Sequence, residues 1–159
     1  MDKEIYNVKV VKFGGSSLAD AEQFKKVGSI IKSDTSRRFV VPSAPGKRFS
    51  GDTKVTDMLY SCYNTAQNGG DFDSVFAMVK DRFDSIIAGL GLSLNLSAEY
   101  EHIKWAILHH AGRDYAASRG EYLNGMILAE YLGYDFIDPA DYIKFCDDGS
   151  FDAETTNGI

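Results

Sequence analysis

The sequence predicts an α/β fold built on a mainly parallel sheet. A short β-branched run at residues 7–13 leads directly into Gly14-Gly15. A segment with helical periodicity follows at 20–32, and a second short apolar run follows at 38–41. A strand, a glycine turn, a helix and a second strand in this order are typical of a parallel α/β unit. The 159 residues fall within the ~100–200 residues of one domain, so we expect a single domain over residues 1–159.

The first half of the chain predicts these elements in order. Residues 7–13 are rich in valine and read as a strand. The helix at 20–32 has Ser17 or Asp20 as its candidate cap, and its apolar face is formed by Phe24, Val27 and Ile31. The second strand at 38–41 ends at Pro42. The next ten residues form a loop of turn-forming residues with two adjacent cations, Lys47 and Arg48.

The second half predicts mostly helix. Periodic apolar residues, interrupted by glycines, predict helices over 53–67, 72–88, 98–110 and 118–132. Trp105 is expected in the core. Residues 134–137 predict a third strand, which Pro139 ends. Three strands are few beside the 4–6 of a common sheet, so we expect further chain to complete the sheet.

Composition excludes several classes of protein. A net charge of −6 and a pI near 5.0 argue against binding nucleic acid through its phosphates. We find no signal peptide and no apolar run of the ~20 residues that a bilayer requires, so we expect a cytoplasmic protein with no membrane partner. Cys62 and Cys146 lack disulfide or zinc spacing, and the three histidines do not form a metal motif. We therefore expect no metal ligand among the side chains.

The segment Lys12-Phe13-Gly14-Gly15-Ser16-Ser17 is the best candidate for binding a phosphate. Glycines let backbone amides approach an anion, a helix start adds its positive end, and Lys12 adds a charge. The segment is not G-x-x-x-x-G-K-[ST], because Lys12 precedes the glycines, and G-x-G-x-x-G is also absent. On the residues alone, a plain turn is the more common use of Gly-Gly after a strand, so both interpretations stay open.

The same segment resembles a known signature. Residues 10–17 are similar to the opening motif of aspartate kinases, within the amino acid kinase superfamily. The likeness continues in the same order along the chain, at residues 39–46, 54–59, 118–123 and 136–138. Pro42 departs from the pattern, since an aliphatic residue is more usual before the serine. Several ordered motifs over most of the chain are more specific than any one of them.

The resemblance implies a fold and an activity. The fold would be the three-layer α/β/α sandwich of amino acid kinases, here as an incomplete N-terminal lobe that lacks the nucleotide-binding part and the regulatory domains. The activity would be transfer of the γ-phosphate of ATP, with Mg2+ bound through the nucleotide, to the β-carboxylate of L-aspartate. This is the first step toward lysine, threonine and methionine. The parent protein would be a homo-oligomer, and the fragment alone would be inactive.

The resemblance also assigns roles to residues. Lys12 would neutralise the phosphates during transfer, the amides of Gly14 and Gly15 would hold the γ-phosphate, and Ser16 would lie beside them. The positions that match the aspartate-binding residues are Ser43, Thr56 and Glu121, with Glu121 facing the ammonium group. The longer loop before Thr56 leaves Thr53 as its alternative.

Other interpretations remain open at this point. Another amino acid kinase would act on glutamate, acetylglutamate or a nucleotide monophosphate. A binding module for anions or amino acids would have the same residues and no turnover. Ser118-Arg119-Gly120-Glu121 also fits a capping box, in which Glu121 closes the N-terminus of a helix.

Overall fold

The computed structural model describes residues 8–158. Two parallel strands, β1 (Lys9–Phe13) and β2 (Arg37–Pro42), pair in register from Val10 opposite Phe39 to Phe13 opposite Pro42. The connection between them contains a 3-10 turn, η1 (Gly15–Leu18), and helix α1 (Ala21–Lys32). The predicted strand–turn–helix–strand unit is therefore present.

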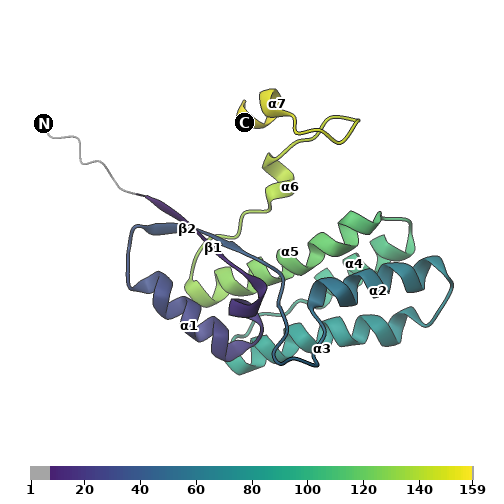
Figure 1. Cartoon of the computed structure of the whole chain (residues 1–159), viewed down its shortest axis with the longest axis horizontal. Helices are drawn as coiled ribbons and strands as arrows, with labels where there is room; N and C mark the ends of the chain where they lie inside the picture. The colour runs from purple at the N-terminus through teal and green to yellow at the C-terminus, as the bar shows by residue number, and fades with distance from the viewer. Residues whose placement is uncertain (1–7, 159) are drawn as a thin grey trace, which may run out of the picture.

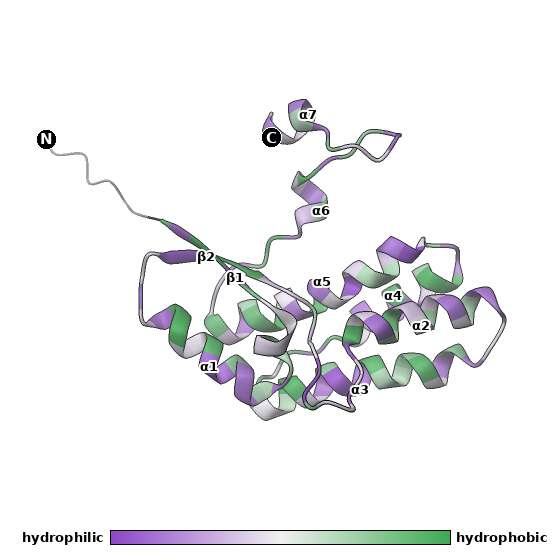
Figure 2. Cartoon of the chain, viewed as in Figure 1, coloured by the Kyte–Doolittle hydropathy of each residue, from purple (hydrophilic) through white to green (hydrophobic). Residues whose placement is uncertain are grey.

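Four further helices form the body of the molecule beneath the strands (Figure 1). They are α2 (Val55–Gln67), α3 (Phe72–Leu90), α4 (Ser97–Leu108) and α5 (Arg113–Leu132). Their apolar faces meet in one core with α1, and the largest fully buried side chains include Phe24, Leu59, Phe83, Ile103, Leu123 and Ile127. In Figure 2 apolar stretches, drawn in green, alternate with polar stretches, drawn in purple, along these helices. Cys62 of α2 is fully buried in this core.

The two faces of the β1–β2 sheet differ. Phe13 of β1 and Val40 of β2 pack against the core. The side chains of the opposite face are exposed, with 69% of Val10, 54% of Phe39 and 47% of Val41 accessible to solvent. In the described part of the chain, helices therefore cover only one face of the sheet.

The carboxyl-terminal segment extends away from the helical body (Figure 1). It holds two short helices, α6 (Pro139–Tyr142) and α7 (Ala153–Asn157), and neither has a buried residue. The third strand predicted at 134–137 is wrong, because these residues pair with no strand among residues 8–158. Phe136 packs instead edge-on against Tyr122 of α5, at 5.4 Å between ring centroids.

The structure corrects two further predictions and decides between the two candidate caps of α1. Helix α5 begins at Arg113, five residues before the predicted start at Ser118. Trp105 is 59% exposed and stacks on His109, so its placement in the core was wrong. Asp20 is the cap of α1, where its carboxylate accepts the Gln23 N–H at 2.9 Å. This carboxylate occupies the positive end of α1, so that end is not offered to a phosphate.

None of the helices in residues 8–158 combines the length and apolar character that crossing a membrane requires.

Candidate functional site

The candidate site lies where β1 and β2 end. Parallel strands place their carboxyl ends at one edge of a sheet, which is where ligands commonly bind in open α/β folds. Here β1 delivers Lys12 and the glycine turn, and β2 delivers Ser43. The Lys12 ammonium donates to the Ser43 hydroxyl at 3.2 Å, and the Ser43 N–H donates to the Phe13 carbonyl at 3.0 Å. Two predicted site residues from distant parts of the sequence are therefore in direct contact.

Helix α5 holds the segment that follows Ser43. The Ala44 N–H donates to Oε1 of Glu121 at 3.1 Å, and Nδ2 of Asn124 donates to the Ser43 carbonyl at 2.7 Å. Glu121 lies inside α5, so the capping-box interpretation is wrong. The Ser118 hydroxyl donates to the Tyr115 carbonyl and caps nothing. The third predicted residue, Glu121, thus lies beside Ser43 through a tertiary contact.

The glycine turn and the Ser43 loop touch through their backbones. The Gly46 N–H donates to the Gly15 carbonyl at 2.8 Å. A Cβ added at Gly15 would lie 2.6 Å from the Ala44 oxygen, and one added at Gly46 would lie 2.6 Å from the Gly15 carbonyl carbon. Both distances are too short for a side chain, so this close approach requires glycine on each side.

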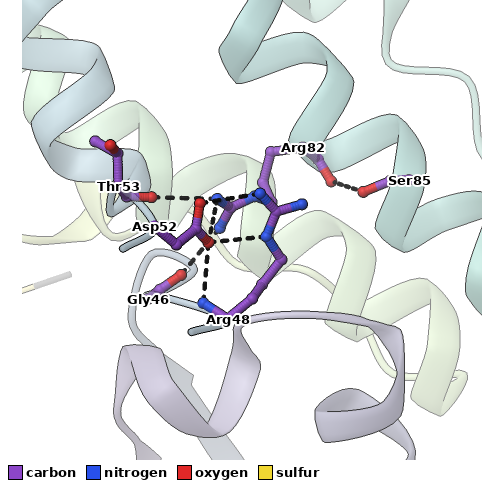
Figure 3. Close-up of polar contacts among 6 residues, drawn as sticks. All are labelled: Gly46, Arg48, Asp52, Thr53, Arg82 and Ser85. Atoms are coloured by element: carbon purple, nitrogen blue, oxygen red, sulfur yellow. Dashed lines mark hydrogen bonds and ion pairs between the residues drawn. The ribbon is translucent and has the colours of Figure 1, made fainter. Parts of the chain in front are cut away.

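A buried charged cluster holds the far end of the same loop (Figure 3). Arg82 of α3 is 3% exposed and donates to the Gly46 carbonyl at 2.9 Å, the Asp52 carboxylate at 2.7 Å and the Thr53 carbonyl at 3.2 Å. Arg48 donates to the same carboxylate from its backbone and its side chain. Hydrogen bonds from Arg48 lower the pKa of Asp52 well below its usual range. Asp52 is therefore an anion that neutralises the buried arginine.

The remaining predicted residues are less tightly connected. Gly14 and Ser16 are exposed at the turn. Thr56 is half-buried in the first turn of α2, and the N–H of the preceding Val55 donates to the Pro45 carbonyl at 3.1 Å. Within residues 8–158, no hydrogen bond joins the hydroxyl of Thr56 or of Thr53 to Lys12 or Ser43. The choice between these threonines stays a prediction.

The arrangement is suited to an anion. It offers an ammonium group, a hydroxyl and the amides of a glycine turn on an exposed surface, and such donors match phosphate or carboxylate oxygens. Residues 8–158 contain no group of three or more histidine, cysteine or acidic side chains placed to hold a metal ion. Two shallow hollows along α3 and α4, of about 210 and 390 Å3, include none of these residues.

Sequence reasoning missed three residues of this region, Asp52, Arg82 and Asn124. A signal for two of them was present. Arg82 falls on the apolar stripe of its helix between Val79 and Phe83, and Asn124 follows Leu123 on the buried face of α5. A polar side chain on an apolar stripe has to find a buried partner.

The chain is similar in sequence to known kinases of amino acids. A sequence profile of the amino acid kinase family matches residues 7–155. The chain is 35% identical over 150 residues to Aspartokinase 3 of Bacillus subtilis (strain 168). This alignment covers 91% of the chain and 33% of the relative, so the chain spans about a third of the relative's length.

Solved structures show the same fold. The chain matches Clostridium acetobutylicum aspartate kinase with a TM-score of 0.90 and 48% identity, over 95% of this chain and 35% of that one. It matches E. coli aspartokinase III, in complex with aspartate and ADP, with a TM-score of 0.73 and 21% identity, over 94% and 36%. The predicted fold class is thus confirmed. Because the profile covers nearly all of it, the chain belongs to the amino acid kinase family.

Proposed function

We propose that this chain is the phosphate- and aspartate-binding lobe of an aspartate kinase. The observation that carries the proposal is the contact of Lys12 with Ser43, beside Glu121 and the glycine turn. These are residues to which the resemblance to aspartate kinases assigns the phosphate and the amino acid. The 48% identity to an aspartate kinase supports this acceptor over the other acceptors of the family.

Phosphoryl transfer to the carboxylate of aspartate requires positioning of the reactants and stabilisation of the charge on the phosphoryl group. The β-carboxylate of aspartate has an ordinary pKa of ~3.9 and is already a nucleophile at neutral pH, so no general base is required. Lys12 stabilises the charge on the transferred phosphoryl group, and the amides of Gly14 and Gly15 hold its oxygens. Ser16 lies beside these amides. Ser43 and Thr56 orient the carboxylates of aspartate.

Glu121 has two roles in this proposal. Its Oε1 accepts the Ala44 N–H, and its Oε2 is the atom that we assign to the ammonium group of aspartate. The side chain is exposed at the site, so a ligand can reach it. One carboxylate thus ties the loop and recognises the substrate.

ATP, Mg2+ and the rest of the enzyme enter as part of the same proposal. The donors of the site fit phosphate oxygens, so we assign magnesium to the phosphates of the nucleotide. We assign residues 1–159 to the N-terminal lobe, and we assign the nucleotide-binding part and the regulatory domains to the two thirds of the relatives' length that this chain does not cover. The parent enzyme is then a cytoplasmic homo-oligomer, and this chain alone does not turn over.

The test is formation of an acyl phosphate by the full-length enzyme. Hydroxylamine traps the product as a hydroxamate, with aspartate, glutamate, acetylglutamate and a nucleotide monophosphate offered in parallel. We expect aspartate to be preferred. We expect Lys12→Met to lower kcat by roughly 10²–10³-fold, the usual effect of removing one preorganised charge-stabilising donor. Lys26→Met, at an exposed lysine of α1, is the matched control.

Two results would contradict the proposal. Preference for another acceptor would reject aspartate as the substrate. A Lys12→Met enzyme with unchanged kcat would remove Lys12 from the chemistry. Separately, robust turnover by the 159-residue chain alone would overturn its assignment as an incomplete lobe.

A further inference from the structure

We propose that Asn124 is a positioning residue that sets the orientation of Ser43 toward the acceptor substrate. This inference rests on the proposed function, because it assigns Ser43 to the acceptor. Nothing in the sequence motifs points to Asn124, which lies one helical turn after Glu121 on α5. The argument comes from the hydrogen bonds of one peptide group.

The peptide group between Ser43 and Ala44 is held at both of its polar atoms. Its carbonyl oxygen, which belongs to Ser43, accepts Nδ2 of Asn124 at 2.7 Å. Its N–H, which belongs to Ala44, donates to Oε1 of Glu121 at 3.1 Å. Residues three apart on a helix share a face, so both side chains form their hydrogen bonds to the peptide group from the same face of α5. Together they fix the plane of this peptide.

The peptide on the other side of Ser43 is also fixed. The Ser43 N–H donates to the Phe13 carbonyl at 3.0 Å, which continues the pairing of β2 with β1. With both flanking peptides fixed, rotation about χ1 is the main freedom left to the Ser43 side chain. Its hydroxyl then remains within reach of the Lys12 ammonium, at 3.2 Å.

The two hydrogen bonds to this peptide group, one with Asn124 and one with Glu121, differ in strength. Asn124 is 0% exposed, whereas Glu121 is exposed and its bond to Ala44 competes with water. A hydrogen bond is electrostatically stronger in the low-dielectric interior than in water. Glu121 also faces the ammonium group of the substrate in the proposed function. The hydrogen bond from the buried Asn124 side chain is therefore the one that holds the Ser43 carbonyl when substrate engages Glu121.

The unused half of the Asn124 amide supports a positioning role. Its Oδ1 is buried and has no hydrogen-bond partner within residues 8–158. The amide cannot be turned around, because the Ser43 carbonyl can only accept and requires Nδ2. A buried unpaired oxygen opposes folding. Stability alone is thus a poor reason for an asparagine here, and holding Ser43 is a better one.

The experiment compares two isosteric variants in the full-length enzyme. Asn124→Leu removes the donor, and Asn124→Asp places an acceptor opposite the Ser43 carbonyl. The control is Ile127→Val, a buried change one turn further along α5 that leaves the loop bonds intact. For each protein we would measure kcat, KM for aspartate, KM for ATP and the thermal midpoint. The values for each variant are compared with those of the wild type and of the control.

We expect KM for aspartate to rise at least tenfold in both Asn124 variants, with KM for ATP and kcat at saturating aspartate within threefold of wild type. Unchanged KM for aspartate in a folded Asn124 variant would overturn the proposal. So would a parallel rise of both KM values, because that pattern is general damage. If both variants fail to fold while the control folds, Asn124 is a stability residue and the proposal is wrong. Wild-type enzyme without activity on aspartate would instead reject the proposed function.

Discussion

At the scale of single residues, the most consequential charge in the fold is that of Arg82. Its guanidinium is buried, and its partners all belong to the loop that carries Gly46, Asp52 and Thr53. Removing one member of a buried ion pair leaves the other charge unpaired in the interior, which is far more costly than losing a surface pair. Arg82 should therefore matter more to stability than any exposed ion pair of the chain.

We expect Arg82→Met to lower the free energy of unfolding by about 3–5 kcal/mol, because it leaves Asp52 with the exposed Arg48 as its only charged partner within residues 8–158. Urea denaturation followed by circular dichroism measures this change. Lys80→Met serves as the control, since its pair with Asp84 is exposed, and it should change stability by less than ~1 kcal/mol. Equal effects of the two variants would contradict a dominant role for the buried cluster.

The same cluster makes the stability of the fold depend on pH in the acidic range. The pKa of Asp52 in the folded chain lies well below its unfolded value of ~3.9, mainly through the hydrogen bonds from Arg48. The stability that this carboxylate contributes is complete above pH ~5 and is lost as the pH falls through the unfolded pKa toward the folded pKa. We expect the urea midpoint of the wild type to fall between pH 4.5 and about 2.5, and to fall less in Asp52→Asn. Parallel curves for the two proteins would exclude this origin.

At the scale of elements, the contact between the glycine turn and the Ser43 loop decides what substitutions the site accepts. Gly14 and Gly15 are adjacent in the sequence, yet the room available to a side chain differs between the two positions. A Cβ at Gly14 meets nothing within 4 Å, and its φ of −76° suits any residue. A Cβ at Gly15 runs into the Ala44 oxygen.

We expect Gly15→Ala to destabilise the chain by about 1–3 kcal/mol, because the backbone of one loop has to move away from the other. Gly14→Ala should stay within about 0.5 kcal/mol of wild type, as for other unstrained surface changes. Thermal unfolding of the two variants gives the comparison. A tolerated Gly15→Ala would show that the loops separate easily.

Local sequence predicted the elements of this chain better than their contacts. Residues 7–13 and 20–32 predicted β1 and α1 because strand and helix periodicity are local. The start of α5 was misplaced because S-x-x-E describes a helix start only where the preceding residues are not helical, and here Arg113 to Ala117 continue the helix. The Glu121 carboxylate therefore does not cap the helix. It accepts a hydrogen bond from the N–H of Ala44, a residue 77 positions away in the sequence.

At the scale of the whole molecule, three apolar side chains on one face of the sheet are open to solvent. Val10, Phe39 and Val41 lie on this face together with exposed Lys12, and exposed apolar side chains that gather on one face can mark a contact region. Sequence could not show this, since alternation predicts two faces for a strand but does not say what covers each. Residues 134–137 have the composition of a strand, yet a strand also needs a neighbouring strand with which to pair.

We expect the 159-residue chain to bind the apolar dye ANS through this face. Replacing Phe39 and Val41 together with threonine should reduce the ANS fluorescence by at least half and change stability by less than ~1 kcal/mol. The control is Ile30→Thr, at an exposed apolar residue of α1. Fluorescence that falls equally in the control would show that the dye does not report on the sheet.

The burial of Cys62 gives the molecule a built-in reporter of its own opening. Loss of hydration raises the pKa of this thiol to about 12, so it carries almost no thiolate at neutral pH, and a modifying reagent cannot reach it in the folded chain. Cys146 is exposed and should react at once. A thiol-labelling time course should therefore have two phases of equal amplitude, and the slow phase would time the excursions that separate α2 from its neighbours.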